Sequence, residues 1–434
     1  MSSNADLHKR RQAAVPRGVT NSLAVYADRA ANAEIWDVEG RRYIDFASGI
    51  SVLNTGHVHP KVKAAIAQQL DKLTHTCFQV TPYESYIALA EALNRIAPGP
   101  TPKKTIFLTT GAEAVENALK IARHRTQRAA IIAFAGAFHG RTLVCSTLNG
   151  KVAPYKTGFG PMLPDVYHVP FPSALHGVSV EDSLAAIGFL FKAEVDPQRV
   201  AAIIIEPVQG EGGFYPAPPE LLKRLRALCD QHGILLIADE VQSGFGRTGK
   251  MFAVEHSGIE PDLITVAKSV AGGVPLSAVI GKAEIMDSPP PGGLGGTYAG
   301  SPLGCAAGLA VLEVIREERL LERANQIGHF MVSRLKGLQA RFPSIAEVRG
   351  LGAMVAIELV KGQRAEQPDA ELKEAVVKAA GRHGLVILGC GLYGNVIRFL
   401  APLTISDAVL KEGFNLFEQA LAEVAPQTLA NTGT

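Results

Sequence analysis

Three ionisable side chains stand where apolar, strand-like segments of the sequence end. Glu206, Asp239 and Lys268 each follow directly on a run of aliphatic residues that is typical of a buried strand. The carboxyl ends of strands in an open parallel sheet face one crevice, so we expect these side chains to meet there. Charges in such a crevice are costly to desolvate unless they serve one another or a ligand. The pattern therefore predicts a polar ligand site at this edge of a sheet.

Lysine and aspartate in one crevice suit a particular cofactor chemistry. A lysine in partly apolar surroundings can lose its proton, and the neutral amine forms Schiff bases with carbonyl compounds. A carboxylate that faces a pyridine nitrogen keeps it protonated, so that the ring can accept electrons from a carbanion. Lys268 and Asp239 are thus candidates for holding opposite parts of pyridoxal 5'-phosphate. The turn at 109–112 precedes a helical pattern, and a helix start of this kind can seat the phosphate.

The elements around these residues indicate an α/β protein. From about 60 to 310, apolar strand-like runs alternate with amphipathic helical patterns, which predicts a mostly parallel sheet covered by helices. Residues 34–46 read as two short strands around a turn. After about 310, a long helical region leads to strand candidates and a last helix, which indicates a smaller α+β domain. We expect residues 1–57 to contribute to that small domain, 58–312 to form the large domain and 313–434 to form the rest of the small one.

Composition excludes several other classes of protein. The 434 residues carry 43 basic and 41 acidic side chains, so the protein has no large positive charge that would attract nucleic acid or an anionic membrane. The first twelve residues contain no apolar segment, and no apolar run approaches the roughly 20 residues of a membrane helix. Five scattered cysteines without a Cys-x-x-Cys pair argue against a disulfide framework and a thiolate zinc site. We expect a reduced, cytoplasmic protein without a metal centre.

Three motifs resemble sites for other ligands. The segment 244–251, GFGRTGKM, departs from a phosphate-binding loop at Met251, and no clear helical pattern follows it. The segment 389–394, GCGLYG, precedes a strand-like run instead of the helix that a dinucleotide site needs, so it predicts a hairpin. His57 and His59 lie in a turn before Pro60 without a cluster of other ligands, which favours a structural role.

The sequence resembles the class III aminotransferases of the pyridoxal-phosphate fold-type I group from about residue 10 to 425. Four segments carry this likeness together: IIIEPVQGEGG (203–213), LLIADEVQSGFGRTG (235–249), TVAKSVAGG (265–273) and GGTYAGSPLGCAA (295–307). Within that family the likeness is closest to the bacterial 4-aminobutyrate aminotransferases. Three further segments carry it: ASGISVLNTGHVHP (47–60), HTCFQV (75–80) and GKVAPY (150–155).

The resemblance implies how the cofactor is held. Lys268 is expected to form the Schiff base and later to move the proton between substrate carbon and cofactor, while Asp239 pairs with the ring nitrogen. The other residues expected to contact the cofactor are Gly111 and Ala112 at the phosphate, Phe138, His139, Val241 and Gln242 around the ring, and Thr297 from a neighbouring subunit. Many relatives carry Ser in place of Ala112 and Tyr in place of Phe138, which leaves the substrate preference open.

The resemblance also implies how substrates are bound. Arg141 is expected to hold the distal carboxylate, with Ile50 lining the pocket and Glu206 helping to position Arg141. Arg398 is expected to bind the α-carboxylate of glutamate or 2-oxoglutarate, and Glu211 to pair with Arg398 when the substrate has none. Two arginines suit an enzyme that must recognise carboxylates at two positions.

We therefore expect a transaminase that moves the ω-amino group of 4-aminobutyrate to 2-oxoglutarate and acts as a dimer or a dimer of dimers. Longer ω-amino acids such as 5-aminovalerate remain open, because sequence does not define the length of a pocket. An aminomutase or racemase on the same fold is the alternative, and it would need no second carboxylate clamp. A nucleotide-binding protein that uses GFGRTGK is a remote third reading.

Overall fold

The computed structural model describes residues 2–362 and 364–425. Within these residues the largest sheet has seven strands in the order β4-β10-β9-β8-β7-β5-β6. β10 runs antiparallel to both of its neighbours and the other strands are parallel, so the predicted mostly parallel sheet is confirmed. The strands are β4 (Lys103–Leu108), β5 (Ala130–Phe134), β6 (Val166–Val169), β7 (Val200–Ile205), β8 (Leu235–Asp239), β9 (Leu263–Val266) and β10 (Ser277–Lys282).

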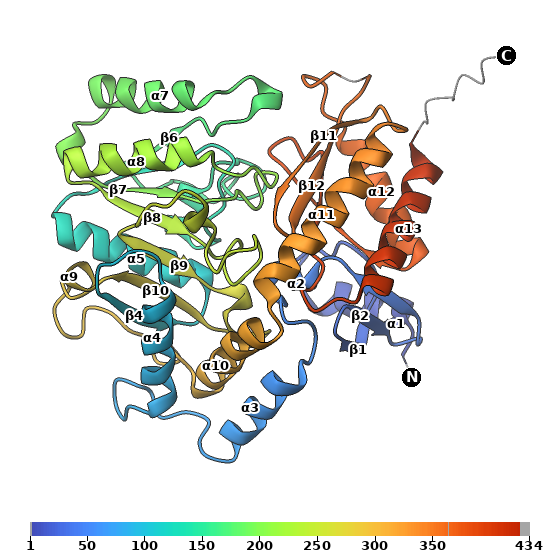
Figure 1. The fold of residues 1–434 in the computed structure, drawn as a ribbon, viewed down its shortest axis with the longest axis horizontal. Helices are drawn as coiled ribbons and strands as arrows, with labels where there is room; N and C mark the ends of the chain where they lie inside the picture. Colours follow the sequence, from blue (N-terminus) through green and yellow to red (C-terminus); the bar gives the residue numbers. More distant parts are fainter. Residues whose placement is uncertain (1, 363, 426–434) are drawn as a thin grey trace.

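Helices cover both faces of this sheet (Figure 1). Successive side chains of a strand point to opposite faces, and β7 shows this clearly. Ile204 packs in the cluster of α5 (Gly111–Thr126), whereas Ile203 and Ile205 pack in the cluster of α8 (Pro219–His232). Every residue of β7 is buried, which explains its continuous apolar sequence. The remaining helices around this sheet are α3 (Pro60–Leu70), α4 (Glu84–Ile96), α6 (Leu143–Leu148), α7 (Val180–Ala193) and α9 (Ala283–Met286).

The C-terminal part contains an antiparallel sheet in the order β11-β12-β15-β14. The helical region predicted after residue 310 is interrupted, because Arg319 takes a left-handed conformation with φ of 52°. Two helices result instead of one. The elements are α10 (Pro302–Glu317), α11 (Leu320–Gln339), β11 (Ile345–Leu351), β12 (Met354–Leu359), α12 (Ala370–His383), β14 (Leu388–Cys390), β15 (Val396–Phe399) and α13 (Asp407–Val424). Residues 426–434 of the predicted C-terminal domain lie outside the described part of the chain.

The N-terminal strands lie beside the C-terminal elements (Figure 1). The predicted hairpin forms, and its second strand pairs in parallel with a strand from the far end of the chain. This small sheet has the order β1-β2-β3-β13. Its strands are β1 (Ala27–Ala31), β2 (Glu34–Asp37), β3 (Arg42–Asp45) and β13 (Leu385–Val386), and the helices near it in the sequence are α1 (Asn4–Ala14) and α2 (Ser48–Ser51).

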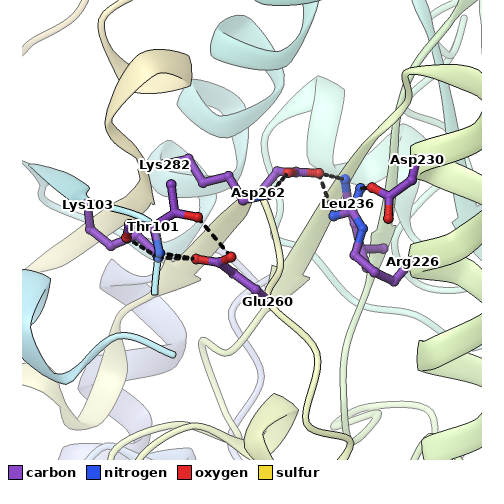
Figure 2. Close-up of polar contacts among 8 residues, drawn as sticks. All are labelled: Thr101, Lys103, Arg226, Asp230, Leu236, Glu260, Asp262 and Lys282. Atoms are coloured by element: carbon purple, nitrogen blue, oxygen red, sulfur yellow. Dashed lines mark hydrogen bonds and ion pairs between the residues drawn. The ribbon is translucent and has the colours of Figure 1, made fainter. Parts of the chain in front are cut away.

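Buried ion pairs join neighbouring strands at the end of the large sheet where its parallel strands begin (Figure 2). Asp262, just before β9, lies 2.7 Å from both Arg226 of α8 and Lys282 of β10. Its Oδ2 also accepts a hydrogen bond of 2.8 Å from the backbone N–H of Leu236. A second cluster consists of Glu260, Lys103 and Thr101. These contacts join a covering helix to neighbouring strands at the end of the sheet opposite Glu206, Asp239 and Lys268.

The glycine-rich segments that resemble nucleotide sites have structural roles. In the 244–251 loop, Arg247 is buried and donates to Asn54 Oδ1 at 3.1 Å and to the carbonyl of Ala401 at 2.7 Å. The loop thus ties the large sheet to the C-terminal part. The 389–394 segment joins β14 to β15 as an antiparallel hairpin, as predicted.

The histidine turn also has a structural role, because His59 caps α3 by accepting a hydrogen bond from the N–H of Lys61. The described residues contain no group of His, Cys, Asp and Glu side chains that could hold a metal ion. Among the helices of that same part of the chain, none has the length and apolar character needed to cross a membrane.

Candidate active site

A cavity of about 370 Å³ opens at the carboxyl ends of β7, β8 and β9. The three side chains that the sequence places at these strand ends all line it. Residues from the loops after β4 and β5, residues 273–276 before β10 and Val52 also line it. Those of the predicted site that line this cavity are Gly111, Ala112, Phe138, His139, Glu206, Glu211, Asp239, Val241, Gln242 and Lys268.

A second cavity of about 650 Å³ adjoins the first and shares Phe138, Glu211 and Lys268 with it. It extends between the large sheet and the C-terminal part. Further residues of the predicted site that line it are Ile50, Arg141 and Arg398. Lys268 therefore lies at the junction of the two cavities, within reach of ligands in either.

Lys268 begins a 3-10 turn (Lys268–Ala271) after β9 and has φ of 48°. A left-handed conformation at a non-glycine residue is strained, and such strain often marks functional sites. Burial in the wall lowers the pKa of the ammonium group from 10.5 to about 8. The amine is thus much more readily available in its neutral, nucleophilic form than that of an ordinary lysine.

Asp239 ends β8 and is held through both carboxylate oxygens. His139 Nδ1 donates to Oδ2 at 2.6 Å, while Oδ1 accepts from Thr265 Oγ1 at 3.0 Å and from the N–H of Val241 at 3.1 Å. Burial opposes protonation of His139, but the carboxylate of Asp239 outweighs it and raises the pKa of the imidazole. Three donors therefore orient the carboxylate of Asp239 at the cavity wall.

The start of α5 forms a seat for an anion. Thr110 caps the helix by accepting from the N–H of Glu113, whose carboxylate accepts in turn from the N–H groups of Thr109 and Thr110. Gly111 and Ala112 follow at the first helical positions and line the cavity. Their N–H groups contact no acceptor in the part of the chain that the structure describes. Free amides and the helix dipole at this point favour a phosphate.

The walls between the anion seat and Asp239 suit a flat, partly polar ring. Phe138 and Val241 are half-buried and line the cavity. The side-chain oxygen of Gln242 is buried and has no hydrogen-bond partner among the described residues. An unsatisfied buried acceptor costs about 1–3 kcal/mol, so a ligand that donates to it would be stabilised there.

Glu206 is almost fully buried after β7 and accepts backbone hydrogen bonds of 3.0 Å from Phe138 and from Gly210. Burial raises the pKa of its carboxyl group to about 7. The family resemblance predicts that Glu206 helps to position Arg141. Within the described residues no ion pair joins the two, and the Arg141 guanidinium lies 5.1 Å from the centre of the Tyr155 ring instead.

Arg398 of β15 and Glu211 form an ion pair in the second cavity, with 2.7 Å between Nη1 and Oε1. Burial opposes ionisation of both groups, but each charge stabilises the other, so the pKa of Glu211 is lowered and that of Arg398 is raised. Tyr155 donates to the other oxygen of Glu211 at 3.4 Å. Nε of Arg398 has no hydrogen-bond partner in the described part of the chain, so the guanidinium retains a donor for a further anion.

Three predicted residues are more exposed. Arg141 and Ile50 both face the second cavity, and Ile50 sits in a kinked segment with φ of 67°. Thr297 is exposed and is not part of either cavity wall, so its expected contact with a neighbouring subunit stays a prediction. Sequence reasoning missed Tyr155, which contacts both Glu211 and Arg141, although the segment GKVAPY that contains it had been singled out.

Comparisons with known proteins identify a family of similar proteins. The family model for aminotransferase class-III matches residues 14–421. The 5-aminovalerate aminotransferase of Pseudomonas aeruginosa is 58% identical over 423 residues, which cover 98% of this chain and 99% of that protein. The 4-aminobutyrate aminotransferase of Escherichia coli is 54% identical over 423 residues, with the same coverage.

Solved structures show the same fold. A Bacillus anthracis aminotransferase superposes with a TM-score of 0.91 at 28% identity and covers 98% of this chain and all of its own. A pyridoxal-phosphate-bound amine transaminase from an uncultivated Pseudomonas species gives a TM-score of 0.85 at 31% identity, over 95% of this chain and 97% of its own. From the family match, the long relatives and the shared fold, it follows that this chain belongs to the class III aminotransferases.

Proposed function

We propose that this chain is a pyridoxal-phosphate-dependent aminotransferase that moves the terminal amino group of 4-aminobutyrate and of 5-aminovalerate to 2-oxoglutarate. The ion pair of Glu211 and Arg398, beside Lys268 and in one cavity with Arg141, is the observation that carries the proposal. Arg141 offers a guanidinium to a carboxylate far from the amine. Arg398 offers a second guanidinium, which Glu211 either neutralises or leaves free for another carboxylate. One relative is named for 5-aminovalerate and another for 4-aminobutyrate, and both names support the same substrate class.

The residues of the first cavity fit pyridoxal phosphate. Lys268 would hold its aldehyde carbon, Asp239 its ring nitrogen, and the N–H groups of Gly111 and Ala112 its phosphate. The free acceptor of Gln242 suits the hydroxyl edge of the ring. When bound, the cofactor supplies an electron-accepting ring that stabilises negative charge on the substrate carbon.

Two residues would manage charge and protons during the reaction. Lys268, with a pKa of about 8, can take a proton at Nζ from the substrate carbon that carries the amine. The same nitrogen would then give this proton to the cofactor. The carboxylate of Asp239 would pair with the protonated ring nitrogen, with His139 fixing the orientation of that carboxylate. Burial of both groups keeps water away and strengthens these interactions.

The two arginines would distinguish the two substrates by their carboxylates. With an ω-amino acid, Arg141 would bind the distal carboxylate and Glu211 would stay on Arg398, which avoids an unpaired buried guanidinium. With 2-oxoglutarate, the carboxylate next to the keto group would take the place of Glu211 on Arg398. The site then serves a substrate with one carboxylate and a substrate with two.

The test is to incubate the purified protein with 2-oxoglutarate and a series of ω-amino acids and to measure glutamate. We expect glutamate with 4-aminobutyrate and 5-aminovalerate, and the ratio of their kcat/KM values defines the preferred length. Absence of glutamate with every donor would refute the proposal. Conversion of an amino acid without any keto acid would instead support an aminomutase or racemase.

We also propose that the active form is at least a dimer in which Thr297 of one protomer contacts the phosphate bound by the other. Thr297 is exposed, as such a contact requires. The test combines sedimentation with the Thr297→Ala variant. Weaker cofactor binding by a variant that remains dimeric would support the contact, and unchanged binding would contradict it.

A further inference from the structure

Two arginines lie on the same face of the C-terminal sheet, and one of them, Arg398, lines the second cavity. Arg349 of β11 pairs with Ala356 of β12, and Ala356 pairs with Arg398 of β15. Directly paired residues of antiparallel strands share a face, so both guanidinium groups stand on one side of the sheet with the small Ala356 between them. The Arg349 and Arg398 side chains are both buried.

The loop that carries Glu211 is held at two points by these arginines. Arg398 pairs with the Glu211 side chain, and its guanidinium carbon lies 5.9 Å from the Phe214 ring centre. Arg349 Nε donates to the carbonyl of Gly213 at 2.8 Å, and its guanidinium carbon lies only 3.7 Å from the ring centre of Tyr215. Both arginines therefore contact one short segment, Arg398 at positions 211 and 214 and Arg349 at positions 213 and 215.

The contact at Gly213 leaves little room. Gly213 has φ of 130°, and a Cβ atom added there would lie 3.0 Å from Arg349 Nη2 and 3.1 Å from the Tyr215 ring. A side chain at this position would push the loop away from Arg349. Because Glu211 is only two residues away, such a shift would also change the reach of its carboxylate toward Arg398.

The position of Arg349 is itself fixed by a buried acid. Nη1 of Arg349 lies 2.7 Å from Glu358, which is 1% exposed and also binds Tyr215 and His176. The same nitrogen lies 2.6 Å from Glu347, whose side chain is 31% exposed. Exposed ion pairs contribute little, whereas a buried pair is sensitive to the loss of either partner. Glu358 thus anchors Arg349, and Glu347 serves as a matched control.

We infer that Arg349 is a positioning residue that holds the Gly213 carbonyl and thereby keeps Glu211 within reach of Arg398, which favours substrates without an α-carboxylate. This inference rests on the proposed function. The half-reaction with an ω-amino acid needs Glu211 on Arg398, whereas the half-reaction with 2-oxoglutarate needs Arg398 free. Loosening the loop should therefore impair the first half-reaction selectively.

The test measures each half-reaction of the holoenzyme separately by the change in cofactor absorbance. Arg349→Lys keeps a positive charge beside Glu358 but cannot reproduce the planar set of donors that reaches both Glu358 and Gly213. We expect kcat/KM for 4-aminobutyrate to fall by about tenfold or more, the effect of one lost hydrogen bond in a buried site. We expect the value for 2-oxoglutarate to change by less than about threefold.

Controls separate positioning from a general loss of structure. Glu347→Gln removes only the charge of the half-exposed partner and keeps the shape of its side chain, so it should leave both half-reactions unchanged. Asp262→Asn, at the opposite end of the large sheet (Figure 2), should lower thermal stability without a selective effect. Gly213→Ala displaces the loop while Arg349 is intact, so it should give the same selective loss even if Arg349→Lys does not fold.

An equal loss in both half-reactions of these variants, or no loss in either, would overturn the positioning role of Arg349. A wild-type protein that transaminates no ω-amino acid would instead overturn the proposed function, and it would do so before any variant is compared.

Discussion

The lowered pKa of Lys268 predicts how fast the cofactor-free protein captures pyridoxal phosphate at different pH values. Burial lowers this pKa from 10.5 to about 8, and only the neutral amine attacks an aldehyde. Near neutral pH the neutral fraction is then about 300-fold larger than for an ordinary lysine. The capture rate should rise with pH and level off above about 8.

The same shift has a defined effect on stability. The folded protein disfavours the charged ammonium, so between pH 8 and 10.5 the unfolded chain binds more protons at Lys268. This residue therefore makes the cofactor-free protein more stable as pH rises through that window, and its destabilising effect is complete below it.

The assay mixes cofactor-free protein with pyridoxal phosphate across a pH series and follows the absorbance change, with Lys268→Ala as the control that should show no such change. A capture rate that keeps rising beyond pH 10, as for an exposed lysine, would refute the reasoning. A rate already constant at pH 6 would refute it as well, because it would require a much lower pKa.

Three further substitutions test other parts of the site. Asp239→Asn keeps the shape but removes the charge that pairs with His139, and it should slow both half-reactions by about a hundredfold or more; a rate within threefold of wild type would contradict this. Glu211→Gln should lower kcat/KM for 4-aminobutyrate by about tenfold or more, because Arg398 loses its partner, and should leave the value for 2-oxoglutarate nearly unchanged. Equal effects on the two substrates would argue against exchange of Glu211 for a carboxylate. Asp262→Asn should lower the free energy of unfolding in urea by about 3 kcal/mol without changing kcat, whereas an unchanged free energy would show that the pairs in Figure 2 contribute little.

The sequence predicted which edge of the large sheet lines the first cavity because simple rules apply there. Continuous apolar runs indicate strands buried on both faces, and the residue after each run lies at a common edge. Glu206, Asp239 and Lys268 could therefore be placed around one cavity before the structure was known. The antiparallel direction of β10 could not be anticipated, because this strand is buried along nearly its whole length, like the parallel strands of the sheet, and no local pattern sets its direction.

The ion pair of Arg398 and Glu211 was predicted only through family resemblance. Arg398 lies in an ordinary strand pattern, and Glu211 lies in a glycine-rich turn that could equally be a solvated loop. Their pairing depends on how the C-terminal sheet docks against the 209–215 loop, which no local pattern encodes. The row of Arg349, Ala356 and Arg398 was missed for a related reason, because it requires the register of three strands.

The central claim is that the amine of Lys268 and the carboxylate of Asp239 hold one molecule of pyridoxal phosphate. The most direct measurement is borohydride reduction of the purified holoenzyme followed by mass spectrometry of its peptides. We expect the reduced cofactor on Lys268 alone, and none on any lysine of the Lys268→Ala variant. A label on another lysine, such as Lys373 in the wall of the second cavity, or no label at all would contradict the claim.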